Sequence, residues 1–180
     1  MHLTFETHSW SEDNDRGVAT GWLPGRLSAR GRDLAAELGE RRRDASVVFV
    51  SDLGRAMETA TIAFAGRGKP VLADWRLREC DYGRLNGMPA TQLHSGRRAH
   101  LDEPYPEGES WRAAIGRVDA FLNDLQGRLG GRWSHGRVLI IGHVATRWAL
   151  DCRLAGRTLE DLIDADFAWR EGWDYELDPS

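Results

Sequence analysis

The sequence has few of the features that mark membrane, secreted or nucleic-acid-binding proteins. No apolar run approaches the roughly 20 residues that a helix needs to cross a bilayer, and the N-terminus lacks the basic and apolar regions of a signal peptide. The formal net charge is -4, which argues against a nucleic-acid-binding surface, because such surfaces contact phosphate through many Lys and Arg side chains. We therefore expect a cytoplasmic protein with no membrane and no nucleic-acid partner.

Cysteine is also scarce. Only Cys80 and Cys152 are present, and neither belongs to a CxxC or Cys/His cluster with the spacing of a metal site. His94, His100 and His135 share no ligand spacing with carboxylates or cysteines either. The sequence therefore predicts no metal site and indicates no cofactor.

The order of elements that the sequence does contain is typical of an α/β fold. With 180 residues, 41% of them hydrophobic, the chain is long enough for one domain with a full core. Apolar runs expected to form strands cover residues 3–7, 47–50, 70–72 and 137–141. Helical spacing begins at Ser28, at Ser51 or Asp52 as the cap of the next helix, near Glu109 and after His143. The alternation predicts a three-layer α/β/α sandwich around a mostly parallel sheet over residues 1–180.

Three segments depart from this alternation. Residues 82–106 contain three glycines and three prolines, so we expect a small irregular cap over the sheet. The polar loop after the first strand is also rich in glycine and is expected to lack regular structure. Residues 167–177 alternate apolar and polar side chains around Glu171 and Gly172, which predicts an edge hairpin. Two copies of the chain could pair through this edge as a homodimer.

Two histidines follow predicted strands that lie far apart in the sequence. His8 directly follows the strand 3–7, and His143 directly follows the apolar run 138–142. Because ligands in α/β proteins bind at the carboxyl ends of strands, we expect the two side chains to meet across one pocket.

Four segments form an ordered set around these histidines. Residues 7–11 with Asn14 stand where a known family has Arg-His-Gly-Glu-Thr followed by Asn. Residues 51–60 are similar to its Ser-Asp-Leu-x-Arg-Ala-x-x-Thr-Ala, residues 77–83 to Leu-Arg-Glu-x-x-Phe/Tyr-Gly, and residues 142–144 to Ser-His-Gly. Over nearly its whole length the chain thus resembles the histidine phosphatase family, also called the phosphoglycerate mutase-like family.

This resemblance implies roles that match the needs of phosphoryl transfer: a nucleophile, donors to the phosphoryl oxygens and an acid for the leaving group. His8 would attack phosphorus and form a phosphohistidine, and His143 would bind the phosphoryl oxygens. Arg55 and Asn14 would donate further hydrogen bonds to phosphate. Glu79 would protonate the leaving oxygen and then deprotonate water, and burial beneath the cap would supply the raised pKa that this needs.

Plainer roles stay open for three of these residues. Arg55 could form a local ion pair with Asp52 or Glu58, and Glu79 could pair with one of the arginines beside it. Asn14 could serve as a turn residue.

The first segment departs from the family pattern, because Thr7 stands where the family has an arginine. The loss of one charge-assisted donor from a phosphate pocket costs on the order of 2 to 3 kcal/mol. Arg26 or Arg147, and less readily Arg84, could swing in as a replacement.

Trp10 stands in place of a polar family residue beside the expected nucleophile. An indole there would form an apolar wall, so we expect a substrate with a hydrophobic or ring-shaped part. Ser9 and Val144, which follow the two histidines, are expected to line the same pocket.

These observations leave three functional hypotheses. The leading one is a cofactor-independent phosphomonoesterase that acts on a small phosphorylated metabolite; the short cap argues against a mutase, which must keep its phosphorylated intermediate away from water. A second is acid–base chemistry on a less anionic substrate, which the neutral Thr7 would permit. The third is a binding protein that has lost catalysis.

Overall fold

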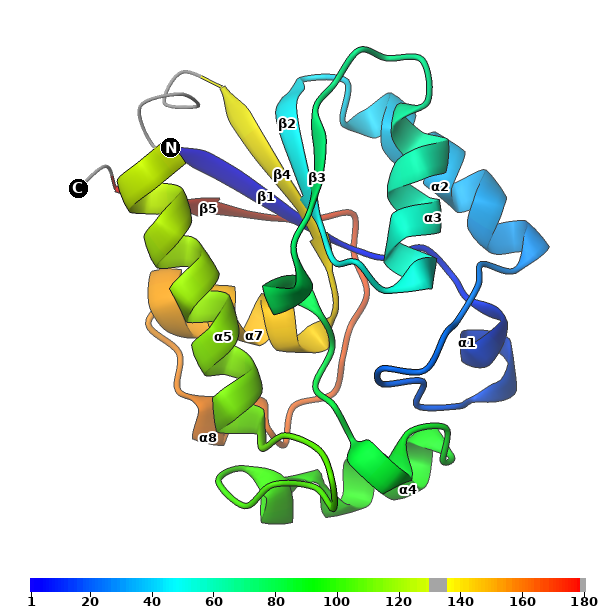
Figure 1. Cartoon of the computed structure of the whole chain (residues 1–180), viewed down its shortest axis with the longest axis vertical. Coiled ribbons are helices and arrows are strands. Elements are labelled where there is room, and N and C mark those ends of the chain that lie inside the picture. Colours follow the sequence, from blue (N-terminus) through cyan, green and yellow to red (C-terminus); the bar gives the residue numbers. More distant parts are fainter. Residues whose placement is uncertain (130–135, 179–180) are drawn as a thin grey trace.

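The computed structural model of the chain describes residues 1–129 and 136–178 and contains a five-stranded sheet in the order β3-β2-β4-β1-β5 (Figure 1). The strands are β1 (His2–Thr7), β2 (Ala45–Val50), β3 (Val71–Ala73), β4 (Arg137–Gly142) and β5 (Trp173–Glu176). All neighbouring pairs are parallel except β1 and β5, which are antiparallel. The predicted mostly parallel sheet is therefore confirmed.

Helices cover both faces of the sheet and complete the predicted α/β/α sandwich. In Figure 1, α2 and α3 lie on one side of the sheet, and α5, α7 and α8 lie on the other. The α-helices are α1 (Glu12–Arg16), α2 (Ala29–Arg41), α3 (Gly54–Phe64), α4 (Ala90–Gly96), α5 (Trp111–Asp124), α7 (Val144–Leu154) and α8 (Leu159–Leu162). A π-helical turn (Leu125–Leu129) extends α5, and 3-10 turns cover Trp75–Leu77, Gly83–Leu85 and Arg97–His100.

The central strand β4 explains why both faces must be covered. Val138 and Ile140 belong to one buried cluster, which includes apolar residues of α5 and α7, whereas Leu139 and Ile141 belong to another, which includes apolar residues of α2 and α3. A strand that is apolar on both faces is typical of a parallel sheet between two helical layers.

Of the two side-chain caps predicted for helices, one is present and the other is not. The Ser28 hydroxyl accepts a hydrogen bond from the backbone N–H of Gly31 and so caps α2, as predicted. The cap predicted for α3 at Ser51 or Asp52 is wrong, since α3 starts after Leu53 without a side-chain cap. Both polar side chains have other partners: Ser51 contacts His143, and Asp52 contacts Arg78.

The segment after β1 is more regular than predicted. Instead of a continuous polar loop, it contains the short helix α1. Ser11 and Asn14 form a reciprocal capping box at its start, which explains how a glycine-rich stretch still begins a helical turn. The expected cap also contains short helices, and α4 lies beyond the carboxyl ends of the strands (Figure 1).

The prediction of a C-terminal hairpin over residues 167–177 is wrong. In this range only β5 is a strand, and it pairs antiparallel with β1 from His2 to Phe5. Trp173 and Tyr175 enter the core, which accounts for one half of the alternating pattern. Phe167 and Trp169, the other half, belong to an irregular segment that lines a cavity. Within the part of the chain that the structure describes, no helix is long and apolar enough to span a bilayer.

Candidate active site

The carboxyl ends of three adjacent parallel strands bring Ser51, His143 and His8 together. His8 N–H donates to the carbonyl of Gly142 at 3.0 Å, and Ser51 N–H donates to that of Ile141 at 3.0 Å, so the residues after β1, β4 and β2 lie at one level. The imidazole centroids of His8 and His143 are 5.1 Å apart. The two histidines therefore meet at one site, as the strand positions indicate.

Arg55, in the first turn of α3, lies between the two imidazoles. Its Nε is 3.2 Å from Nε2 of His8, and its Nη2 is 3.2 Å from Nδ1 of His143 and donates to the carbonyl of Gly21 at 3.0 Å. Its Nη1 is buried and has no hydrogen-bond partner among the described residues. Arg55 as a residue is 2% exposed, and the buried Nη1 is available to an anion that enters the site.

The local ion pairs considered for Arg55 are not formed. Asp52 instead accepts two hydrogen bonds of 2.7 Å from Arg78, and Glu58 pairs with Arg32 at 2.8 Å. Arg55 is thus directed toward the histidines.

The hydrogen bonds of His8 define its tautomer. Nδ1 lies 2.7 Å from the carbonyl oxygen of Ser9, which can only accept, so Nδ1 carries the proton. Nε2 then bears the lone pair and accepts from Arg55. Burial, and then the charge of Arg55, lowers the pKa of His8 to about 3, so its imidazole is neutral near pH 7.

His143 is the complementary case. Its Nδ1 accepts from Arg55, so the proton lies on Nε2, which donates to the Ser51 hydroxyl at 2.9 Å. Burial, Arg55 and His8 hold the pKa of His143 well below its usual value. Both imidazoles are therefore neutral, and Arg55 supplies the positive charge between them.

Glu79 is buried beside α7. Its Oε1 accepts from the backbone N–H of Cys80 at 2.9 Å and of Ala145 at 3.1 Å, and its Oε2 accepts from that of Val144 at 3.3 Å. Burial nevertheless raises the pKa of Glu79 above its ordinary value, although these donors and Arg55 act in the opposite direction. A carboxyl group with a raised pKa is suited to act as a general acid.

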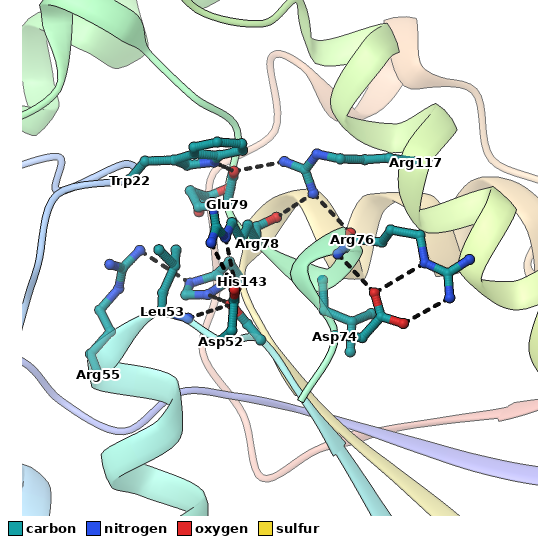
Figure 2. A network of polar contacts seen from close by, with 12 residues as sticks. Trp22, Asp52, Leu53, Arg55, Asp74, Arg76, Arg78, Glu79, Arg117 and His143 are labelled. Atoms are coloured by element: carbon teal, nitrogen blue, oxygen red, sulfur yellow. Dashed lines mark hydrogen bonds and ion pairs between the residues drawn. The ribbon is translucent and has the colours of Figure 1, made fainter. Parts of the chain in front are cut away.

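The loop that carries Glu79 is held by Arg117 of α5 (Figure 2). Arg117 Nη1 donates to the carbonyls of Arg76 and Arg78 at 2.8 and 2.9 Å, and Nη2 donates to that of Glu79 at 2.7 Å. Trp22 Nε1 donates to the same Glu79 carbonyl at 2.6 Å. Four donors thus hold the backbone around Glu79.

The sequence interpretation did not identify Arg117 or the contact of Ser51 with His143. A signal for Arg117 exists: it lies on the buried face of α5 with Ala114, Val118 and Phe121, where an arginine needs internal partners.

A cavity of about 560 Å³ opens in front of the imidazoles. All nine residues expected at the site line it: Thr7, His8, Ser9, Trp10, Asn14, Arg55, Glu79, His143 and Val144. The ordered motifs therefore converge on a single cavity.

Three of these residues have bonds that limit what they can do there. The Ser9 hydroxyl donates to the carbonyl of Gly31 at 2.6 Å. Asn14 Oδ1 accepts from the N–H and hydroxyl of Ser11 at 2.9 and 2.8 Å, so its amide nitrogen is the group left for a ligand. The Val144 N–H is directed to Glu79.

The arginines considered as replacements at the Thr7 position lie elsewhere. Arg26 is within 3.9 Å of Glu12, Arg84 pairs with Glu107, and Arg147 lies over the ring of Trp173. None of the three is among the described residues that line the cavity, so none of them replaces the missing arginine in this structure. Glu6, which is buried next to Thr7 in β1, forms an ion pair of 2.7 Å with Arg42.

Within residues 1–129 and 136–178, no group of three His, Cys, Asp or Glu side chains has the arrangement of a metal site. His135 lies outside the described residues.

Comparison with known proteins gives one family. The sequence model of the Histidine phosphatase superfamily (branch 1) matches residues 6–168. The 2,3-bisphosphoglycerate-dependent phosphoglycerate mutase of Neisseria gonorrhoeae is 28% identical over 220 aligned positions, which cover 99% of this chain and 95% of the mutase.

Two solved structures share the fold. The alpha-ribazole phosphatase of Shigella flexneri superposes with a TM-score of 0.75 at 25% identity, covering 90% of this chain and 83% of the phosphatase. A mycobacterial glucosyl-3-phosphoglycerate phosphatase, solved with VO3, gives 0.76 at 25% identity, covering 90% and 85%. With the family model matched over most of its length, the chain belongs to the histidine phosphatase superfamily, branch 1.

Proposed function

We propose that the chain is a phosphomonoesterase that transfers a phosphoryl group through a phosphohistidine at His8. The observation that carries this proposal is the Arg55 guanidinium, buried between two neutral imidazoles with one N–H unpartnered among the described residues and with a cavity in front of it. A phosphoryl oxygen is the type of acceptor that such a donor binds best.

In the first step, Nε2 of His8 attacks phosphorus while the bond from phosphorus to the ester oxygen breaks. In its protonated form, which burial favours by raising the pKa, Glu79 gives its proton to the leaving alcohol. Arg55 stabilises the charge on the non-bridging oxygens. His143 stays neutral through the step, and its Nδ1 accepts from Arg55 and so holds the guanidinium beside the phosphoryl oxygens.

In the second step, water attacks the phosphohistidine and Glu79, now a carboxylate, accepts the water proton. The bond between phosphorus and Nε2 breaks, inorganic phosphate leaves, and both His8 and Glu79 return to their starting states. His8 and Glu79 thus act in both steps, and the proton that Glu79 gives in the first step is replaced in the second.

Hydrolysis is favoured over mutase activity by the size of the chain. The alignment with the Neisseria mutase extends over 220 positions, more than the 180 residues present here, so the mutase contains segments that this chain lacks. Less protein is then available to keep water from the phosphorylated intermediate.

The direct test is hydrolysis of p-nitrophenyl phosphate by the purified protein, with and without EDTA, between about pH 5 and 8. We expect turnover that EDTA leaves unchanged. Replacing Arg55 with methionine should lower kcat/KM by about 10²–10³-fold. As a matched control, Arg32→Met on the exposed side of α2 should keep the activity. A protein that binds phosphate but shows no turnover would contradict the proposal.

Thr7→Arg tests whether a second cation limits the rate. Thr7 lines the cavity next to His8, and an added guanidinium there should raise kcat/KM for p-nitrophenyl phosphate by about 100-fold, which corresponds to 2 to 3 kcal/mol. Thr7→Met is the control for size without charge. If Thr7→Arg instead lowers the rate, a less anionic substrate and acid–base chemistry at the same residues become the better account.

Arg117→Met should displace the Glu79 loop, because the carbonyls of Arg76 and Arg78 lose this donor and that of Glu79 keeps only Trp22. We expect kcat to fall by up to about 100-fold with KM little changed, and the basic limb of the pH profile to move. The control is Arg112→Met, on the same helix but half-exposed, with only surface ion pairs. An unchanged pH profile would mean that Arg117 serves stability alone.

A further inference from the structure

We propose that one side of the cavity is a binding arm for an aromatic, uncharged group on the phosphate ester. This inference rests on the proposed phosphomonoesterase function and specifies its substrate class. The arm consists of Trp10, Leu34, Leu38, Phe167 and Trp169, and we call it the aromatic arm. It comes from α2, the loop after β1 and the C-terminal segment, not from the cap.

One face of α2 forms the base of the aromatic arm. The residues of this helix that line the cavity are spaced three or four apart, which places them on a single face: Arg30, Leu34, Glu37, Leu38 and Arg41. The cap supplies a separate group of lining residues: Tyr82, Ala90, His94 and Arg97. Helix α2 and the cap therefore contribute separate groups of lining residues, and His8 and Arg55 line the same cavity.

Exposed aromatic side chains gather at this arm. Of the four exposed Trp and Phe side chains among the described residues, Trp10 (38%), Phe167 (37%) and Trp169 (55%) line the cavity. The fourth, Trp75, is 52% exposed and does not line it. Large apolar side chains that remain exposed around a concave surface are typical of a ligand site.

One wall of the arm is held in place. The Trp10 carbonyl accepts from Ser28 N–H at 3.1 Å, and its indole Nε1 donates to Asp15 at 2.6 Å. A Cβ at Gly31 would lie 1.8 Å from the Trp10 carbonyl oxygen, so the glycine allows α2 to approach this closely. Arg30 lies over the Trp10 ring, 5.5 Å from its centroid, and the side chain is still exposed, so Trp10 is a fixed side chain with part of its surface open to a ligand.

The C-terminal part of the arm is partly held. Phe167 packs near Trp173, with ring centroids 6.0 Å apart. Trp169 has no hydrogen-bond or ring partner within the described part of the chain. Its indole can thus turn onto a bound ring without breaking a hydrogen bond or a ring pair.

The charges around the arm disfavour a second anionic group. The charged residues that line this side of the cavity are three acids and two arginines, an excess of one negative charge: Glu6, Glu37, Glu171, Arg30 and Arg41. Arg41 lies 3.6 Å from Glu6 and 4.0 Å from Glu171, so its charge is already matched. A carboxylate or second phosphate in the arm would meet these acids, whereas an uncharged ring would not.

The test compares phenyl phosphate, 2-naphthyl phosphate and 6-carboxy-2-naphthyl phosphate, which are all aryl esters and differ in the group offered to the arm. We expect kcat/KM to be roughly tenfold or more higher for the naphthyl ester than for the phenyl ester, and the carboxylate to cancel this gain. Trp169→Ala and Trp10→Ala should remove the preference. Trp169→Phe should keep most of it, and Trp75→Ala should leave it unchanged.

The outcomes separate the arm from the proposed function. Equal kcat/KM for the phenyl and naphthyl esters, with hydrolysis that depends on His8, would overturn the aromatic arm and leave the phosphatase in place. If neither ester is hydrolysed, the proposed function fails, and calorimetry with the same two esters decides about the arm. Tighter binding of the naphthyl ester that Trp169→Ala abolishes would support the arm, and equal binding would overturn it.

Discussion

His8→Ala is expected to lower kcat by at least about 10⁴-fold, because it removes the group proposed to form the bond to phosphorus. The fold should persist, since the His8 ring contacts Ser9 and Arg55 at the cavity and is not part of the apolar core. Circular dichroism and steady-state hydrolysis of p-nitrophenyl phosphate measure the two effects. His2→Ala, at an exposed position of the same strand, is the matched control and should retain full activity.

Trapping of the intermediate gives the direct proof for His8. Wild-type protein mixed with substrate and quenched rapidly should gain the mass of one phosphoryl group, and the His8→Ala variant should not. Because the pKa of His8 is about 3, its lone pair stays available down to roughly pH 4. No acidic limb from His8 is therefore expected between about pH 5 and 8. Phosphorylation that persists in the variant would assign the nucleophile elsewhere.

Glu79→Gln is expected to slow esters with poor leaving groups by about 10²–10⁴-fold, the range of general acid catalysis. The effect on p-nitrophenyl phosphate should be much smaller, because its leaving group needs little protonation. Rates for a series of alkyl and aryl phosphates give this comparison. The exposed Glu103→Gln variant in the cap serves as the control, and equal losses across the series would mean that Glu79 is not the acid.

The pH profile gives a second signature of Glu79. A general acid must carry its proton, and burial raises the pKa of Glu79. Wild-type kcat/KM should therefore be flat below this raised pKa and fall as the pH rises through it. Glutamine cannot ionise, so this descending limb should disappear in the variant. A limb that persists would belong to another group.

The sequence was most informative where structure is local or ordered in the chain. Apolar runs predicted the parallel strands, and the order of the motifs placed His8, Arg55, Glu79 and His143 around one cavity. The spacing of apolar residues and the order of the strands along the chain determine these positions. Both are visible in the sequence without knowledge of long-range contacts.

The errors arose where distant partners decide the outcome. Ser51 looked like a helix cap, but the imidazole of His143, 92 residues away, takes its hydroxyl. Arg117 binds carbonyls 38 to 41 residues away, which no local spacing indicates. Phe167 and Trp169 are spaced like the apolar residues of a strand. An extended segment that lines a cavity with every second side chain has the same two-residue period.

The position of Arg55 has a consequence for the chemical stability of the nucleophile. The His8 Nε2 lone pair that would attack phosphorus accepts a hydrogen bond from Arg55 Nε. The residue proposed to bind the substrate therefore also occupies this lone pair before the substrate enters. An anion that takes this N–H for itself releases the lone pair at the moment when a suitable phosphorus atom is in reach. A neutral electrophile cannot replace His8 as the acceptor of this N–H. We therefore expect His8 to react slowly with alkylating and acylating reagents and readily with its phosphorylated substrate.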